Sequence, residues 1–190
     1  MRTAIALLLI SLGLVFLLFV KINSDSLIKD YKYIGVERCK ACHSVKFRGD
    51  QYNIWKNSPH SGSMLALNTS KAKDYAFKNK ITDPLKNMDC LKCHSTGYSR
   101  EIKYFESSFN LMEGVQCESC HNPGSEYSKY QIMISNGKFI GNGGEEGNLK
   151  DCYKCHSANV SDNKSVKCPF QLKNFNAESS FQLIKHSIPK

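Results

Sequence analysis

Histidine and tryptophan are scarce in this sequence, whose 190 residues include six histidines and one tryptophan. Long segments in which apolar and polar residues alternate, typical of half-buried strands, are absent. No Ser/His/Asp arrangement with histidines to spare is visible, which argues against a hydrolase of that type. Lys+Arg exceed Asp+Glu by 26 to 17, for a net charge of +9. The basic residues are scattered and form no compact arginine cluster, so this charge does not predict a nucleic-acid partner.

Cysteine, in contrast, is abundant and arranged in a regular pattern. Eight of the nine cysteines form four Cys-x-x-Cys pairs, and a histidine follows each pair directly. The four motifs comprise Cys39, Cys42 and His43; Cys90, Cys93 and His94; Cys117, Cys120 and His121; and Cys152, Cys155 and His156.

The motif has the spacing that c-type haem attachment requires. In such sites two thiols form thioethers with the haem, and the adjacent histidine binds its iron. Zinc ribbons, disulfides and thioredoxin-like motifs also use paired cysteines, but none of them requires histidine at the next position. With so few histidines, chance would place one after all four pairs with a probability of roughly one in a million. The motifs therefore predict four covalently bound haem c groups, held by these twelve residues.

Four six-coordinate haems need eight axial ligands, and the motif histidines supply four of them. His60 and His186 are the two further histidines, and we expect both to bind iron. The other two haems would need methionine, lysine, water, a ligand from another chain, or an empty position. The methionines after the N-terminal segment are available, although methionine more often serves packing; they are Met64, Met88, Met112 and Met133.

Residues 4–20 form an uncharged apolar run that begins after Met1-Arg2-Thr3 and ends at Lys21. As a helix it would span roughly 25 Å, about the thickness of a bilayer core. Because no Ala-x-Ala site follows, we expect an uncleaved membrane anchor, with a cleaved signal sequence as the alternative. Either interpretation divides the chain into an N-terminal segment, 1–21, and an exported domain, 22–190. The domain would lie on the periplasmic side of the membrane, anchored there or soluble.

We expect a mainly α fold with extensive loops and little β structure, wrapped around the four haems. Residues 44–57 and 69–80 are predicted to be helical, and residues 97–114 an irregular connection. Besides the haem faces, the chain has too few apolar residues to form a large core. The chain without haem is therefore expected to have no stable fold. Cys168, the ninth cysteine, is expected to be a small buried hydrophobe, with a free thiol as the alternative.

Three segments resemble the tetrahaem cytochrome c-554 family. Residues 88–98 and 114–124 are similar to the family's Cys-x-x-Cys-His-x-x-Gly-aromatic and Gly-Val-x-Cys-Glu-Ser-Cys-His-Gly-Pro-Gly patterns. The segment from Trp55 to Met64 is similar to its Trp-x-x-x-x-His-x-x-x-Met pattern. The resemblance covers roughly residues 34–160 and is most specific in residues 88–124.

The resemblance implies an axial ligand set. His60 would pair with His121, His186 would pair with His156, and the His94 haem would be five-coordinate with an open face. The family's histidine after the Pro-Gly of the third motif is missing here, so the sixth ligand of the His43 haem is undetermined. The candidates for that position are Tyr127, Lys129 and Met133, or no ligand at all.

The leading functional hypothesis is that the chain is not an enzyme but an electron-transfer protein, which exchanges electrons with other redox proteins. One alternative is a membrane quinol dehydrogenase of the NapC/NrfH type, which would reach the quinol pool through residues 4–20. That family places methionine two residues after an early motif histidine, whereas His43 is followed by Ser44-Val45. The other alternative is a haem enzyme that acts on a small nitrogen or oxygen species at an open iron.

Overall fold

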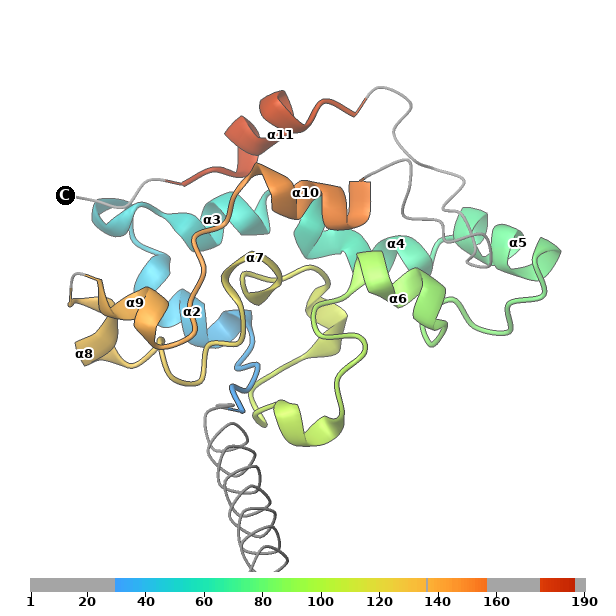
Figure 1. Ribbon diagram of the computed structural model, residues 1–190. Coiled ribbons are helices and arrows are strands. Elements are labelled where there is room, and N and C mark those ends of the chain that lie inside the picture. Colours follow the sequence, from blue (N-terminus) through green and yellow to red (C-terminus); the bar gives the residue numbers. More distant parts are fainter. Residues whose placement is uncertain (1–29, 136, 157–174, 187–190) are drawn as a thin grey trace, which may run out of the picture. The chain divides into compact units, whose positions relative to one another are not determined.

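The computed structural model describes residues 30–135, 137–156 and 175–186 (Figure 1). The chain divides into two units, residues 1–30 and 31–190, and the description below concerns the second unit. The expected N-terminal anchor or signal sequence and Cys168 lie outside the described residues. Among the helices of the described ranges, none is both long enough and apolar enough to cross a membrane.

Short helices joined by loops make up the described part of the second unit (Figure 1). The α-helices are α2 (Val36–His43), α3 (Gln51–Lys56), α4 (Ser63–Leu67), α5 (Ser70–Lys78), α6 (Met88–His94), α7 (Glu118–His121), α8 (Tyr130–Met133), α9 (Lys138–Gly141), α10 (Leu149–His156) and α11 (Ala177–Ile184). Single 3-10 turns occur at η1 (Lys46–Arg48), η2 (Pro59–Gly62), η3 (Ile102–Tyr104) and η4 (Leu111–Glu113). The β pairing found within these ranges is one isolated parallel bridge between Tyr33 and Phe105. The predicted fold class, mainly α with long loops, is confirmed.

The two predicted helical segments have different outcomes. Residues 69–80 contain α5, which Thr69 caps by accepting a hydrogen bond from the Ala72 N–H at 3.3 Å. The prediction of one helix over 44–57 is wrong, because η1 ends before Gly49 and α3 begins only at Gln51. Gly49 and Asp50 have φ values of 99° and 55°. Two consecutive left-handed residues reverse the chain and cannot continue a right-handed helix.

The start of α2 is held by two side chains, one within the third Cys-x-x-Cys-His motif and one directly before it. The buried carboxylate of Glu118 accepts hydrogen bonds from the N–H groups of Ile34, at 2.9 and 3.1 Å, and Gly35, at 2.9 Å. The side-chain oxygen of Gln116 accepts from the Val36 N–H at 2.8 Å. Free N–H groups at a helix start need acceptors, and the N-cap residue of α2 is a glycine that supplies none. The third motif therefore supplies the tertiary cap of the helix that carries the first motif.

Burial alone would make this carboxylate costly, and it raises the pKa of Glu118. The N–H groups of Ile34, Gly35 and Gly124 act in the opposite direction, since each donates to the ionised group. The Gly124 N–H lies 2.7 Å from the carboxylate and ties the loop after the third motif to the same point. Glu118 thus joins three chain segments at one buried position.

Two small apolar clusters each lie against a motif cysteine. The first consists of Val36 from α2 with Tyr52 and Trp55 from α3, and Cys117 packs on it. The Trp55 indole N–H also donates to the Val115 carbonyl oxygen at 2.7 Å. The packing of α3 on α2 therefore continues to the start of the third motif.

The second cluster joins α4 to the second motif. Met64 and Leu67 from α4 pack on Leu91 from α6, and Leu85 and Cys90 lie against them. Met64 is fully buried in this cluster, at 0% exposure. Burial among aliphatic side chains is the packing role that methionine usually has in proteins.

Replacement of the Glu118 carboxylate tests the tertiary cap. Glu118→Gln would remove the charge and replace one of the two acceptor oxygens with an amide NH₂ group, so that either the Gly35 N–H or the Gly124 N–H would face a donor. We expect the free energy of unfolding to fall by at least about 2 kcal/mol, because hydrogen bonds to charged groups contribute about 1.5–3 kcal/mol each. Guanidinium denaturation followed by circular dichroism measures this loss.

The matched control is Glu126→Gln. Glu126 forms a surface ion pair with Lys129 at 2.7 Å, and both side chains are more than one-third exposed. Exposed pairs contribute about 0–1 kcal/mol. Equal effects of the two substitutions would show that Glu118 does not hold the start of α2.

Candidate haem-binding site

Each Cys-x-x-Cys-His motif forms the end of a helix, and its histidine is the last helical residue. The first motif ends α2, the second ends α6, the third ends α7 and the fourth ends α10. Residues three and four positions apart lie on the same face of a helix. Each motif therefore presents two thiols and one imidazole on one helical face, which is the donor set that haem c attachment requires.

His94, at the end of α6, is anchored to the start of α4. Its Nδ1 lies 2.6 Å from the Ser63 carbonyl oxygen, and a carbonyl oxygen can only accept, so Nδ1 carries the proton. The Ser63 hydroxyl lies within hydrogen-bond distance of the His94 carbonyl oxygen at 2.9 Å and the His60 carbonyl oxygen at 2.8 Å. This network orients the ring and leaves Nε2 as the nitrogen that can bind a metal.

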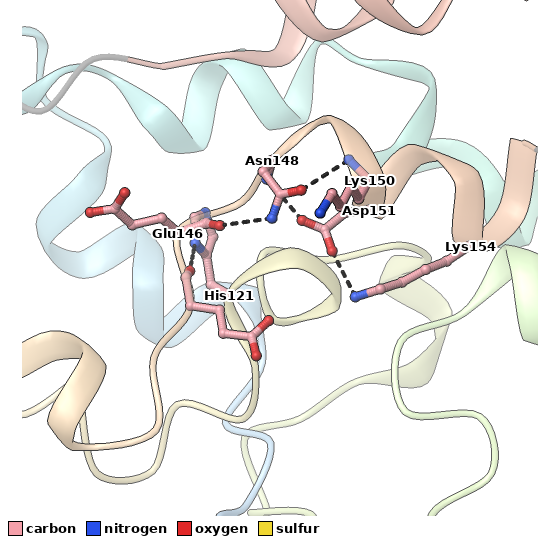
Figure 2. Close-up of polar contacts among 7 residues, drawn as sticks. His121, Glu146, Asn148, Lys150, Asp151 and Lys154 are labelled. Carbon is pink, nitrogen blue, oxygen red and sulfur yellow. Dashed lines mark hydrogen bonds and ion pairs between the residues drawn. The ribbon is translucent and has the colours of Figure 1, made fainter.

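His121 is anchored in the same way to the loop before α10 (Figure 2). Its Nδ1 lies 2.7 Å from the Glu145 carbonyl oxygen, and the Glu145 N–H donates to the His121 carbonyl oxygen at 3.2 Å. The two residues are thus joined by a reciprocal pair of hydrogen bonds. Here too Nδ1 must carry the proton, and Nε2 is left for a metal.

The same loop caps α10, the helix of the fourth motif (Figure 2). The Asn148 side chain accepts from the Lys150 N–H at 2.9 Å, and the Asp151 carboxylate accepts from the Asn148 N–H at 2.8 Å. The two bonds resemble a capping box, with the N–H of the second helical residue in place of the third. Asp151 also pairs with Lys154 at 2.6 Å. The loop that orients His121 therefore fixes the start of the helix that ends at His156.

His43 differs in the kind of acceptor, because its Nδ1 lies 3.1 Å from the side-chain oxygen of Gln51. Metal-binding histidines usually donate their other ring N–H to an oxygen, which fixes the tautomer and the orientation of the ring. His43, His94 and His121 all have this arrangement. The hydrogen bonds on these three rings therefore show, independently of the cysteine spacing, that the motif residues fit a haem iron.

His60 and His186 each lie beside a motif histidine. The ring centroids of His60 and His156 are 6.2 Å apart, and those of His186 and His121 are 5.6 Å apart. A histidine nitrogen lies about 2.0–2.1 Å from a bound transition metal, so two histidines on opposite sides of one iron have centroids about 6 Å apart. Both pairs have a separation close to that of two axial ligands.

These neighbours are the reverse of the pairing that the resemblance implied, in which His60 belonged with His121 and His186 with His156. The reason is the direction of the C-terminal segment, which packs against α10 (Figure 1). Phe175, before α11, stacks on His156 at 4.3 Å, whereas His186, after α11, lies by His121. The segment therefore runs antiparallel to α10 and carries His186 away from His156. These positions favour His60 with His156 and His186 with His121, and the axial pairing itself stays a prediction.

Partial burial favours the neutral form of the histidines in these pairs. Desolvation lowers the pKa of His60, and the neighbouring His156 lowers it further. The pKa of His156 is lowered by desolvation, and that of His186 by desolvation and then by the nearby His121. A neutral imidazole has the free lone pair that metal binding needs, so the folded chain favours the binding-competent form.

Cysteines of different motifs influence one another. The neighbouring Cys117 thiol raises the pKa of Cys39. The neighbouring Cys155 thiol lowers the pKa of Cys93 to about 7, and the Cys155 Sγ lies 3.7 Å from the Lys92 carbonyl oxygen in the second motif. The first motif therefore touches the third, and the second touches the fourth. This juxtaposition is not evident from motif starts that are 51, 27 and 35 residues apart in the sequence.

Two of the three candidates for the sixth ligand of the His43 haem have other partners. The buried Tyr127 hydroxyl donates to the Asn122 carbonyl oxygen at 2.8 Å, and Lys129 pairs with Glu126 at 2.7 Å. Met133 is at the surface, with 39% exposure. The acceptors Gln51, Ser63 and Glu145 were not predicted from the sequence, since two of them act through backbone carbonyls that any residue possesses.

Comparison with known proteins adds a sequence relationship to this geometry. Residues 38–122 match the family described as cytochrome c554 and c-prime. The chain is also 33% identical over 115 residues to cytochrome c-554 of Nitrosomonas europaea. That region is 58% of this chain and 46% of the relative, so the match spans about half the relative's length. No solved structure matches the chain.

The axial pairing can be tested with a variant that lacks the fourth haem. We expect His60→Ala to produce one additional high-spin haem in the electron paramagnetic resonance spectrum, relative to the unsubstituted protein, because the iron opposite His156 would lose a ligand. In a Cys152→Ser/Cys155→Ser background, His60→Ala should then cause no further change. A new high-spin signal in that background would instead support pairing of His60 with His121. Mass spectrometry of each variant counts the attached haems.

Proposed function

We propose that this chain, which belongs to the cytochrome c-554 family, is a multihaem c-type cytochrome that carries single electrons between redox proteins. Membership of this family implies covalently bound haem c. The fourth motif lies beyond the residues that match the family, so the number of four haems is part of the proposal. When bound, haem c supplies a one-electron iron couple whose potential the protein adjusts.

The observation that carries this function is the contact between motifs. Glu118 in the third motif accepts a hydrogen bond from the Gly35 N–H at the start of α2, the helix that carries the first motif. The Cys155 Sγ of the fourth motif lies 3.7 Å from the Lys92 carbonyl oxygen in the second motif. The hydrogen bonds between His121 and Glu145 link the third motif to the loop before the fourth. These contacts hold the attachment points of different cofactors against one another, as a protein that relays electrons requires.

The residues around the motifs hold the ligands in one orientation. The acceptors on His43, His94 and His121 fix each ring, and Glu118 fixes the first motif relative to the third. A ligand that does not move between oxidation states suits rapid electron exchange, and no side chain has to transfer a proton.

We propose a binding set of twelve attachment residues and six iron ligands. The attachment residues are Cys39, Cys42, His43, Cys90, Cys93, His94, Cys117, Cys120, His121, Cys152, Cys155 and His156. The iron ligands are the four motif histidines together with His60, beside His156, and His186, beside His121. The His43 and His94 haems would then take no further histidine of this chain, which makes them the candidates for an open coordination position.

Rapid reduction of the purified holoprotein tests the relay. After mixing with less reductant than the haems can accept, we expect electrons to distribute among all haems within the first kinetic phase, because the motifs contact one another. Stopped-flow absorbance spectra measure this distribution. A haem that is reduced only in a separate, slow phase would contradict a relay.

The same preparation separates the two alternative functions. Steady turnover with a soluble quinol analogue would favour the quinol dehydrogenase, and consumption of nitric oxide would favour the haem enzyme. Carbon monoxide binding to the reduced protein without turnover would indicate an open iron in an electron carrier.

We also propose that residues 22–190 lie on the periplasmic side of the membrane and meet their redox partners there. The uncharged run of residues 4–20 supports export and anchoring. Fractionation of cells that produce the full chain tests this location. We expect the haem-stained band in the membrane fraction, released by detergent but not by high salt. Release with the soluble periplasmic proteins would instead indicate that the N-terminal segment is cleaved.

A further inference from the structure

The acceptor that faces His43 is a side chain, whereas the acceptors that face His94 and His121 are backbone carbonyls. The side-chain oxygen of Gln51 lies 3.1 Å from His43 Nδ1. The carbonyl oxygens of Ser63 and Glu145 lie 2.6 and 2.7 Å from the Nδ1 atoms of His94 and His121. Substitution can therefore change the hydrogen bond of His43 without changing the backbone.

A second hydrogen bond fixes which way the Gln51 amide faces. Its Nε2 donates to the Arg48 carbonyl oxygen at 2.5 Å, and that oxygen can only accept. The amide oxygen is therefore the atom that faces His43, and His43 Nδ1 must carry the proton. The Nε2 atom of His43 is left with its lone pair, in the form that binds iron.

The local fold holds Gln51 in this place. The left-handed residues Gly49 and Asp50 turn the chain back after η1, and Gln51 is the first residue of α3. The Asp50 N–H closes the turn by donating to the Val45 carbonyl oxygen at 3.2 Å. The turn that interrupts the predicted helix over 44–57 is thus what brings Gln51 back to the histidine that ends α2.

The strength of the acceptor on Nδ1–H affects how strongly a histidine donates to its metal. A stronger acceptor makes the imidazole more basic and stabilises ferric iron, and the loss of the acceptor does the reverse. We infer that Gln51 is a positioning residue that fixes the His43 ring and sets the reduction potential of the haem attached to the first motif. This inference rests on the proposed function, because it requires a haem at that motif.

Two substitutions of Gln51 are expected to shift the reduction potential of this haem in opposite directions. Gln51→Glu keeps the size of the side chain and offers His43 a carboxylate oxygen, while Gln51→Leu removes the acceptor. Both variants lose the hydrogen bond to the Arg48 carbonyl oxygen, so they differ only in the acceptor for His43. Both are compatible with the helix, since glutamate is favourable in its first turn and leucine is a good helix former. A spectroelectrochemical titration of each holoprotein resolves the haem potentials.

We expect a single haem to respond. Its potential should fall in Gln51→Glu and rise in Gln51→Leu, each by about tenfold in the one-electron equilibrium constant, or about 59 mV. The electron paramagnetic resonance g-values of one haem should change as well. The matched controls are Gln131→Glu and Gln131→Leu in α8, where the side chain is exposed. These controls should leave all the potentials within error.

Each other outcome overturns a definite part of the proposal. Mass spectrometry that finds no haem on the first motif would overturn the proposed function at this site. With all four haems attached, unchanged potentials in both Gln51 variants would overturn the role of Gln51. Shifts of the same sign in both variants would also overturn it, because they would reflect a general disturbance of the structure and not the strength of the acceptor.

Discussion

The histidine at the end of α2, α6, α7 and α10 is the constraint on which the rest of this structure depends. A covalently attached haem needs two thiols and an imidazole on one face of a single turn. A helix that ends on the histidine provides this arrangement. Such helices are only four to eight residues long here. Isolated helices of this length are not stable in water, so each needs contacts from elsewhere in the chain.

Those contacts are largely polar. Glu118 and Gln116 cap α2 from the third motif, and Asn148 and Asp151 cap α10. The apolar clusters are small, and each includes a motif cysteine, Cys117 in one and Cys90 in the other. Directed hydrogen bonds between segments distant in the sequence therefore do much of the work of placing the motifs.

The same hydrogen bonds orient three of the proposed iron ligands. His94 and His121 donate to backbone carbonyls, and these bonds also join α6 to α4 and α7 to the loop before α10. His43 donates to a side chain held by its own second hydrogen bond. The interactions that stabilise the fold are therefore also the ones that select the tautomer of each ligand. In the proposed holoprotein, a change in local packing would alter how strongly a histidine donates to its iron, and the chain would have a means of giving its haems different potentials.

Local patterns of the sequence predicted the attachment residues and determined the class of cofactor and the fold class. The reason is that haem c attachment depends on spacing within five consecutive residues, and short helices on a few residues more. The tertiary structure decided which histidine lies beside which, since the pairing depends on the antiparallel course of residues 175–186 along α10. It also decided the turn at Gly49 and Asp50 and the acceptors on each ring. Contacts between residues distant in the sequence leave no local signal, because a carbonyl oxygen is present at every position and only the fold determines which one faces a histidine.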